Sequence, residues 1–352
     1  MADDVLIRQL AGIVATGAPI ILAAVGETLI ERAGLINLGL DGTLTLAAFG
    51  AFITVLTVQT ALTAHQAAGG LFAALSPGAI TLLATLIGVL VAMLIGVAES
   101  LLVAYSSIRL KRSQVAVGFV LTLLCRDLAI FLGGSYRDLG GINVIFAPIP
   151  FLKDIPVVGP IIFQHDIFTY LSLLAVIGAS IWVFRTRPGL VLRSVGERPE
   201  TAFARGTAVN RIRYRYAMMG GALIGLGGAV YTLNVNLTWN ESSISGNGWI
   251  ALAIVIFGGW KPVRVMFGVY LVAALRAVVT ALQSSFSPAI IQIINTLPWL
   301  LMIGTLFLVS SPYLERLLYR LPSRWQTIAG PLVQTLLRAK PPAALGTNFD
   351  EG

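Results

Sequence analysis

The segment "SVGERPETAFARGTAVNRIRYRY", residues 194–216, carries seven charged side chains, five of them Arg, between two long apolar runs. Only 11% of the 352 residues are charged and 57% are hydrophobic. About a quarter of the residues in a soluble domain are charged. A chain with so few charges cannot cover a water-facing surface, so its composition indicates a membrane protein.

The apolar runs on either side of this segment predict nine membrane spans. A helix needs roughly 20 apolar residues to cross a hydrocarbon core of about 30 Å. We place the spans at 9–26, 36–58, 79–106, 114–134, 167–185, 215–235, 248–260, 262–284 and 289–310. The run at 248–260 is too short to cross fully, and polar and Gly residues interrupt the start of the second span. We therefore expect an all-α, polytopic transmembrane helical bundle of about 8–10 spans with interrupted helices.

The positions of Lys and Arg predict the orientation of these spans. If the nine spans alternate, one side receives 19 of the 24 Lys and Arg, and the other receives Arg8, Arg137 and Lys153. Because cytoplasmic loops carry the basic excess, we expect the N-terminus outside and the C-terminus in the cytoplasm. We divide the chain into a membrane domain at 1–311, with a cytoplasmic segment at about 186–214, and a cytoplasmic tail at 312–352. The tail is expected to be partly amphipathic, with a disordered end.

The chain offers no pattern for catalysis or for metal binding. Its one cysteine, Cys125, lies in an apolar run, and its two histidines lie far apart. No disulfide framework or metal site follows from them. No Ser/His/Asp spacing and no phosphate-binding Gly-x-x-x-x-Gly-Lys-[Ser/Thr] loop is present. We assign no catalytic residue, metal or cofactor to this chain. The basic excess is topological, so no nucleic-acid partner is needed.

Within the charged segment, "RPETAFARG" reads as a short helix with both ends marked. Pro199 suits the first helical position, and Gly206 suits the stop. Ala202, Phe203 and Gly206 then fall along one small, apolar side that suits insertion into a groove on another protein. The alternative is a basic loop that only sets the topology, and residue types alone do not separate the two.

Two further regions hold candidate polar sites. Asn37, Asp41 and Thr43 flank two Gly residues, where a broken helix would free backbone groups for a solute. The alternative is that Asn37 or Asp41 caps the second span. Side chains able to bond hydroxyls or base edges, or to stack on a ring, also gather at 233–249: Asn236, Trp239, Asn240, Asn247 and Trp249. The alternative interpretation of 233–249 is an ordinary external loop with a Trp at the membrane interface.

Other intramembrane groups are predicted to serve structure. Glu27 and Glu31 line a gate or make a structural contact, for which Arg276 is the candidate partner. Glu99 and Arg126 lie in neighbouring spans and are predicted to pair. Five Gly residues, at 220, 221, 225, 227 and 228, predict close helix packing.

Three stretches of the chain resemble one family of proteins. Residues 192–231, which end in "AMMGGALIGLGGAVY", resemble the cytoplasmic coupling segment of bacterial ABC-importer permeases for branched-chain amino acids, simple sugars and nucleosides. Residues 26–52, "GETLIERAGLINLGLDGTLTLAAFGAF", look like the start of the nucleoside and simple-sugar branch. Residues 246–271 resemble the later broken span, although 260–262, "WKP", depart from the family's small residues. The matches run from about 10 to 310.

The resemblance implies a permease subunit in a bacterial inner membrane that moves nucleosides delivered by an external binding protein. Simple sugars rank next, and branched-chain amino acids third. It implies a separate cytoplasmic ABC ATPase that binds ATP, a second and similar permease, and an external substrate-binding lipoprotein. The residues implied to contact the ATPase are Glu197, Pro199, Ala202, Phe203 and Gly206. A rival reading is an ion-coupled secondary transporter, which would use the intramembrane carboxylates but leaves the capped cytoplasmic helix unexplained.

Overall fold

The computed structural model describes residues 2–68, 75–137, 139–140, 149–150, 152–282 and 341–350, with isolated positions between 287 and 304. Seven of the described helices are long and apolar enough to cross a membrane. They are α1 (Ala2–Arg32), α2 (Leu40–Ala67), α3 (Pro77–Ile108), α4 (Gln114–Gly133), α5 (Ile167–Arg185), α8 (Val209–Val230) and α11 (Pro262–Leu282). They confirm the polytopic helical bundle. The predicted last span, 289–310, lies outside the described residues except for isolated positions.

Shorter elements connect these helices. They are η1 (Gly134–Tyr136), η2 (Gly159–Phe163), α6 (Arg187–Glu197), α7 (Pro199–Ala204), η3 (Tyr231–Val235), α9 (Glu241–Ile244) and α10 (Asn247–Phe257). With 11 residues, α10 is too short to cross a bilayer, as the sequence predicted. The described residues contain no β-strand, only two isolated bridges near residues 137–140.

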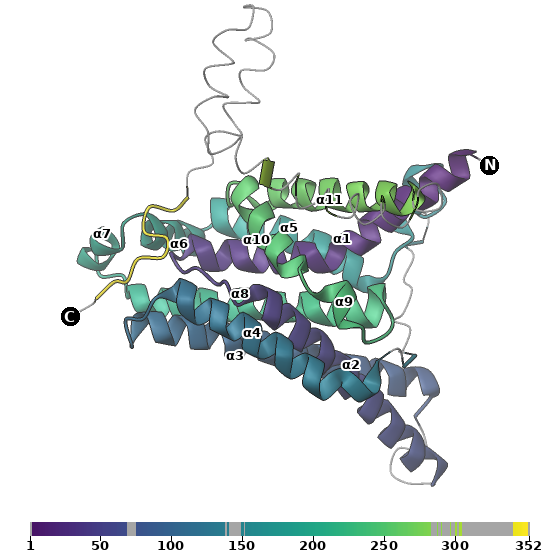
Figure 1. The fold of residues 1–352 in the computed structure, drawn as a ribbon. Helices are drawn as coiled ribbons and strands as arrows, with labels where there is room; N and C mark the ends of the chain where they lie inside the picture. Colours follow the sequence, from purple (N-terminus) through teal and green to yellow (C-terminus); the bar gives the residue numbers. More distant parts are fainter. Residues whose placement is uncertain are drawn as a thin grey trace, which may run out of the picture.

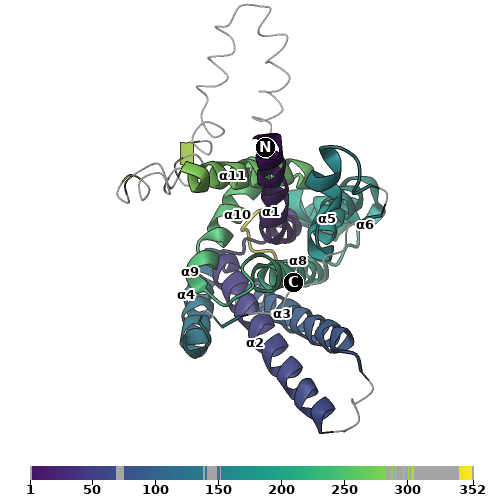
Figure 2. The ribbon, with the colours of Figure 1, turned by 90° about the vertical axis from the view of Figure 1, so that its right-hand side faces the viewer.

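Helix α8 lies at the centre of the bundle. It packs against α1, α2 and α3, and the view along the helices shows it between α1 and α3 (Figure 2). A Cβ added at Gly221 would lie 2.3 Å from the Gly96 carbonyl oxygen, and one at Gly225 would lie 2.1 Å from that of Ala92. These backbones are too close for any side chain. The Gly stripe is therefore a packing surface, as predicted.

The two ends of the bundle differ in what they carry. Helices α6 and α7 and the described C-terminal residues 341–350 lie together at one end, and the N-terminus lies at the other (Figure 1). We call α6 and α7 with the following Gly206 the knob, and the end that carries them the knob end. The short helix α9 lies towards the opposite end (Figure 1).

Candidate functional site

The chain is non-helical at 33–39, between α1 and α2, so the first residues of the predicted second span lie outside the helix, and α2 itself is continuous from Leu40 to Ala67. The Asn37 side chain, fully buried, holds this break. Its Oδ1 accepts a hydrogen bond from the Gly39 amide at 2.8 Å, and its Nδ2 donates to Glu99 Oε2 at 2.9 Å. Thr43 Oγ1 donates to the Gly39 carbonyl at 2.9 Å. Asn37 thus satisfies the Gly39 amide, which has no helical partner, whereas the Gly39 carbonyl accepts from both the amide and the hydroxyl of Thr43.

Asp41 joins the start of α2 to the start of α10. Its Oδ1 accepts hydrogen bonds from the amides of Gly246 and Gly248, at 2.8 and 2.9 Å. A Cβ at Gly248 would lie 2.3 Å from the Asp41 Cα, so the two backbones touch. Asp41 therefore caps α10. The N-cap of α2 is Gly39 and has no side-chain hydrogen bond, so the alternative that Asp41 caps its own span is wrong.

Glu31 and Arg32, at the end of α1, together hold the turn after α10. The Trp260 indole N–H donates to Glu31, and Arg32 donates to the Trp260 carbonyl from Nε at 3.1 Å and from Nη2 at 3.0 Å. Trp260 has φ +54°, a conformation that few bulky residues adopt. These bonds hold the turn at the position where the sequence departs from the family pattern.

The pairs predicted for the buried carboxylates are wrong. Glu31 bonds to Trp260 and not to Arg276. Glu27 accepts a hydrogen bond from the Asn37 amide at 3.2 Å. Glu99 bonds to Asn37 and not to Arg126. The backbone break between α1 and α2 supplies donors to this region, a source of partners that residue types do not reveal.

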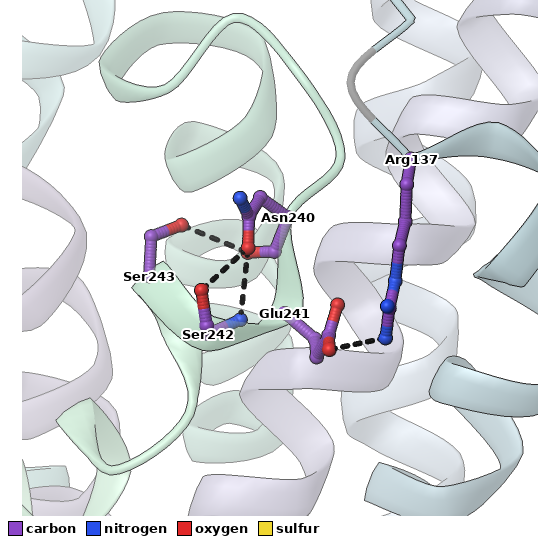
Figure 3. Close-up of polar contacts among 5 residues, drawn as sticks. All are labelled: Arg137, Asn240, Glu241, Ser242 and Ser243. Carbon is purple, nitrogen blue, oxygen red and sulfur yellow. Dashed lines mark hydrogen bonds and ion pairs between the residues drawn. The ribbon is translucent and has the colours of Figure 1, made fainter.

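Two of the polar residues predicted near 233–249 make local contacts. Trp239 is fully buried, with its ring centroid 5.2 Å from that of Phe49, and its indole N–H has no hydrogen-bond partner among the described residues, so its predicted pathway role stays a prediction. Asn240 caps α9, because its Oδ1 accepts hydrogen bonds from the amide of Ser242 at 3.1 Å and from its hydroxyl at 2.7 Å. Figure 3 shows this cap beside the ion pair of Arg137 and Glu241.

Two others lie at the start of α10. Asn247 donates from Nδ2 to the Ser243 carbonyl at 2.9 Å, and its Oδ1 is buried without a partner among the described residues. The half-buried Trp249 ring lies 6.4 Å from the Phe119 ring, centroid to centroid. The structure therefore places Asn247 and Trp249 beside Asp41, where the starts of α2 and α10 meet.

Asn236 instead lines a cavity of about 460 Å³ between α1, η3, α9 and α11, which we call the α1–α11 cavity. Its Nδ2 donates to Ser243 Oγ at 2.7 Å, and both residues border the cavity. The other polar residues that line it are Gln9, Thr16, Tyr231, Arg276 and Thr280. Asn236 is the one predicted pathway residue among the described lining residues.

Sequence analysis missed Tyr231 and Arg276 as cavity residues. Arg276 carried a signal, because an ionisable side chain within an apolar span is a functional candidate. We predicted instead that Arg276 contacts Glu27 or Glu31. Tyr231 carried no signal, since it simply follows the Gly-rich run of α8.

The knob has the local structure that its sequence predicted. Pro199 is the first residue of α7, and Gly206 has φ +83°. However, the side expected to face a partner is divided. Ala202 is 5% exposed and packs against Val195 and Val209, whereas Phe203 is 43% exposed. Ala202 therefore faces this chain's own core, and Phe203 is the apolar side chain that a partner can reach.

Residues 341–350, which we call the strap, are ordered against the knob end, where we expected a disordered end (Figure 1, yellow). The Ala344 amide donates to the Gly196 carbonyl at 2.9 Å, and the Gly346 amide donates to the Gly34 carbonyl at 3.0 Å. Arg213 Nη1 donates to a strap carbonyl at 3.0 Å. Backbone partners and the burial of Ala344, which is 6% exposed, explain an order that the polar composition did not predict.

Side chains extend these contacts to the rest of the knob end. Ser107 Oγ, near the end of α3, donates to Asn348 Oδ1 at 3.0 Å. The Phe349 ring packs edge-on against the Phe203 ring, with centroids 5.8 Å apart. Glu197 of the knob accepts a weak hydrogen bond, 3.4 Å long, from the Ala343 amide. The strap thus connects the knob to α3, to α8 and to the break between α1 and α2.

The knob end is also basic. Lys261, in the turn between α10 and α11, has its pKa lowered by partial burial and by the nearby charges of Arg264 and Arg32. Lys111, in the turn after α3, forms an ion pair with Asp350 of the strap. Basic loops that lie apart in the sequence therefore meet at one end of the bundle, as the predicted alternation of spans requires.

Seven long apolar helices, with the short helix α10 packed against the start of α2, define a multi-pass membrane protein. Residues 9–310 match the family model described as the permease component of the branched-chain amino acid transport system. The match covers most of the chain, which therefore belongs to this family.

Three curated relatives are 33–34% identical to the chain over the aligned residues. It is 34% identical to the nucleoside ABC transporter permease protein NupC of Lactococcus lactis, over 70% of this chain and 74% of that protein. It is also 34% identical to the guanosine ABC transporter permease protein NupQ of Bacillus subtilis, over 86% of this chain and 87% of that protein. A putative glucose ABC transporter permease of Haloferax volcanii is 33% identical over 75% of this chain and 74% of that protein. No solved structure matches the chain.

Proposed function

We propose that this chain is the permease subunit of an ATP-driven ABC importer that moves nucleosides across a bacterial inner membrane. Simple sugars are the second candidate, supported by the Haloferax relative. The observation that carries the proposal is the strap-bound knob, in a chain one third identical to two nucleoside permeases. A short helix fastened at several points transmits a push as a rigid body, which a loose loop does not.

The proposal assigns chemistry and affinity to other subunits. A cytoplasmic ABC ATPase would bind ATP and dock on the knob, so this chain needs no cofactor and is not itself an enzyme. A second permease and an external binding lipoprotein would complete the importer. Since cytoplasmic loops are basic, the knob end faces the cytoplasm and the N-terminus lies outside.

The ion-coupled alternative draws less support from the observed contacts. That reading needs carboxylates free to exchange a proton or a cation. Glu31 instead bonds the Trp260 indole, and Asp41 caps α10. Glu31 and Asp41 therefore hold helix ends, whereas Glu27 Oε2 and Glu99 Oε1 are buried without a hydrogen-bond partner among the described residues and are the carboxylate oxygens left to that alternative.

Co-purification tests the proposed docking on the knob. We expect Phe203→Asp to lower recovery of the ATPase with this chain at least tenfold, because a charge would enter an apolar contact. Leu110→Asp is the matched control: Leu110 is 52% exposed in the turn after α3, at the same end but outside the knob. Equal recovery from both variants would refute docking on the knob. Uptake that survives Phe203→Asp and stops only with an uncoupler would favour ion coupling.

A further inference from the structure

We propose that the α1–α11 cavity binds nucleosides whose base carries a ring carbonyl, and that Arg276 and Tyr231 recognise that carbonyl. This inference rests on the proposed function and makes it specific. The cavity, at about 460 Å³, falls within the range of small-molecule sites, roughly 300–1,000 Å³. Its wall is mainly apolar with a few polar groups, as such sites usually are.

The Tyr231 hydroxyl is the first sign of a missing ligand. Tyr231 is 4% exposed, lines the cavity, and its hydroxyl is buried without a hydrogen-bond partner among the described residues. A buried polar group without a partner is rare, because it costs roughly 1–3 kcal/mol. A solute in the cavity would supply the partner.

Arg276 is the second sign, and it is independent of the first. Its side chain borders the same cavity from α11. Within the described part of the chain, its hydrogen bonding consists of its own backbone carbonyl accepting from Thr280 Oγ1 at 3.0 Å. The N–H groups of the guanidinium are therefore available to donate hydrogen bonds to another molecule. A guanidinium offers a planar fork of N–H donors that matches paired acceptors.

The chemistry of this wall separates the possible solutes. A 6-oxopurine presents O6 and N7, two acceptors that an arginine fork contacts together, whereas adenine presents an amino donor beside N7. An amino acid would place its ammonium group in a cavity with no Asp or Glu among the described lining residues. Asn236 and Thr16 line the same cavity; the Thr16 hydroxyl donates to the Gly12 carbonyl at 2.8 Å, so its oxygen, like Asn236 Oδ1, suits a ribose hydroxyl as an acceptor.

The test compares inosine with adenosine, which differ at position 6 of the base. Uptake of both is measured in the complete importer with its own binding protein. We expect Arg276→Gln to lower the inosine-to-adenosine uptake ratio roughly tenfold. Arg276→Lys keeps the charge but loses the fork of donors. Its inosine-to-adenosine uptake ratio should lie between the ratios of the wild type and of Arg276→Gln. Because the binding protein is unchanged, a shift in the ratio reports on the membrane subunit.

A second variant guards against simple misfolding. Tyr231→Phe removes a hydroxyl that bonds nothing in the described structure, so the thermal stability of the purified permease–ATPase complex should stay the same or rise. Inosine at millimolar concentration should raise the melting temperature of the wild-type complex more than adenosine does. Tyr231→Phe and Arg276→Gln should both reduce that difference.

Two outcomes would overturn the inference. In the first, the uptake ratio is unchanged in Arg276→Gln, whether uptake of both nucleosides stays the same or falls equally. In the second, Tyr231→Phe destabilises the complex and leaves the inosine effect intact. If the wild-type importer takes up neither nucleoside, the proposed function fails and the inference fails with it. If the wild type takes up both and the ratio does not move, only the inference fails.

Discussion

At the scale of single residues, polar side chains in this protein mostly hold breaks in helices. Asn37 and Thr43 bond the segment before α2, Asp41 caps α10, and Asn240 caps α9. In the membrane interior no water is present to bond a freed amide or carbonyl, so side chains must do it. Asn236, Tyr231 and Arg276 are different, because they border a cavity.

Asp41 gives the sharpest residue-scale prediction. Asp41→Ala leaves the buried amides of Gly246 and Gly248 without an acceptor, and we expect the free energy of unfolding to fall by about 2 kcal/mol. Asp41→Asn keeps an acceptor oxygen and should lose less than half of that. Thermal melts of the purified complex measure both, with the exposed-face change Thr57→Ala as control. Equal losses from Ala and Asn would mean that the charge matters and the cap does not.

At the scale of elements, the packing of α8 depends on the absence of side chains. We expect Gly225→Ala to destabilise the protein by about 1–3 kcal/mol, because its Cβ would press on the Ala92 carbonyl of α3. Gly178→Ala on α5 is the matched control, since a Cβ there meets nothing within 4 Å. The control should be neutral or slightly stabilising, because Ala favours helix over Gly. A stable Gly225→Ala protein would contradict the close contact of α8 and α3.

The strap supports a second prediction at this scale. Removing residues 341–352 deletes the bonds to Gly196 and Gly34, so amide hydrogens of the knob and of the break at 33–39 should exchange faster. Hydrogen-exchange mass spectrometry measures this, and a chain that ends at residue 350 serves as control. Unchanged exchange in both segments would show that the strap rests on the knob end without fastening it.

At the scale of the whole molecule, much of the fold follows from the sequence. The predicted span at 167–185 coincides with α5, and the predicted short span becomes α10. The length of an apolar run predicts a span because the thickness of the bilayer sets it, and the Gly stripe predicts close helix packing because small residues let backbones approach in a membrane. The knob was also predicted, since Pro199 and Gly206 mark its ends locally.

The site could be predicted only in part. The cap from Asp41 to α10 spans 205 residues or more, and no local pattern records such a contact. Trp239 was predicted from its residue type, and the structure adds that its ring packs against Phe49 and that its buried indole N–H has no partner among the described residues. The strap looked disordered because its polar residues find their partners only on the folded knob end. Contacts between residues far apart in the sequence determine the role of each of these residues, and residue types alone do not reveal such contacts.

The bond between Asp41 and α10 has a consequence for how the protein is made. The ribosome adds roughly 5–20 residues per second, so about 10–40 s pass between synthesis of the carboxylate and of the amides that it will cap. Asp41 lies in the first turn of α2, and until those amides exist its carboxylate lacks the two backbone donors that it has in the folded protein. During that interval the first hairpin is best kept beside the insertion machinery or in a shallow position. We therefore expect a late step in the biogenesis of this bundle, in which the start of α2 takes its final position only after α10 has been synthesised.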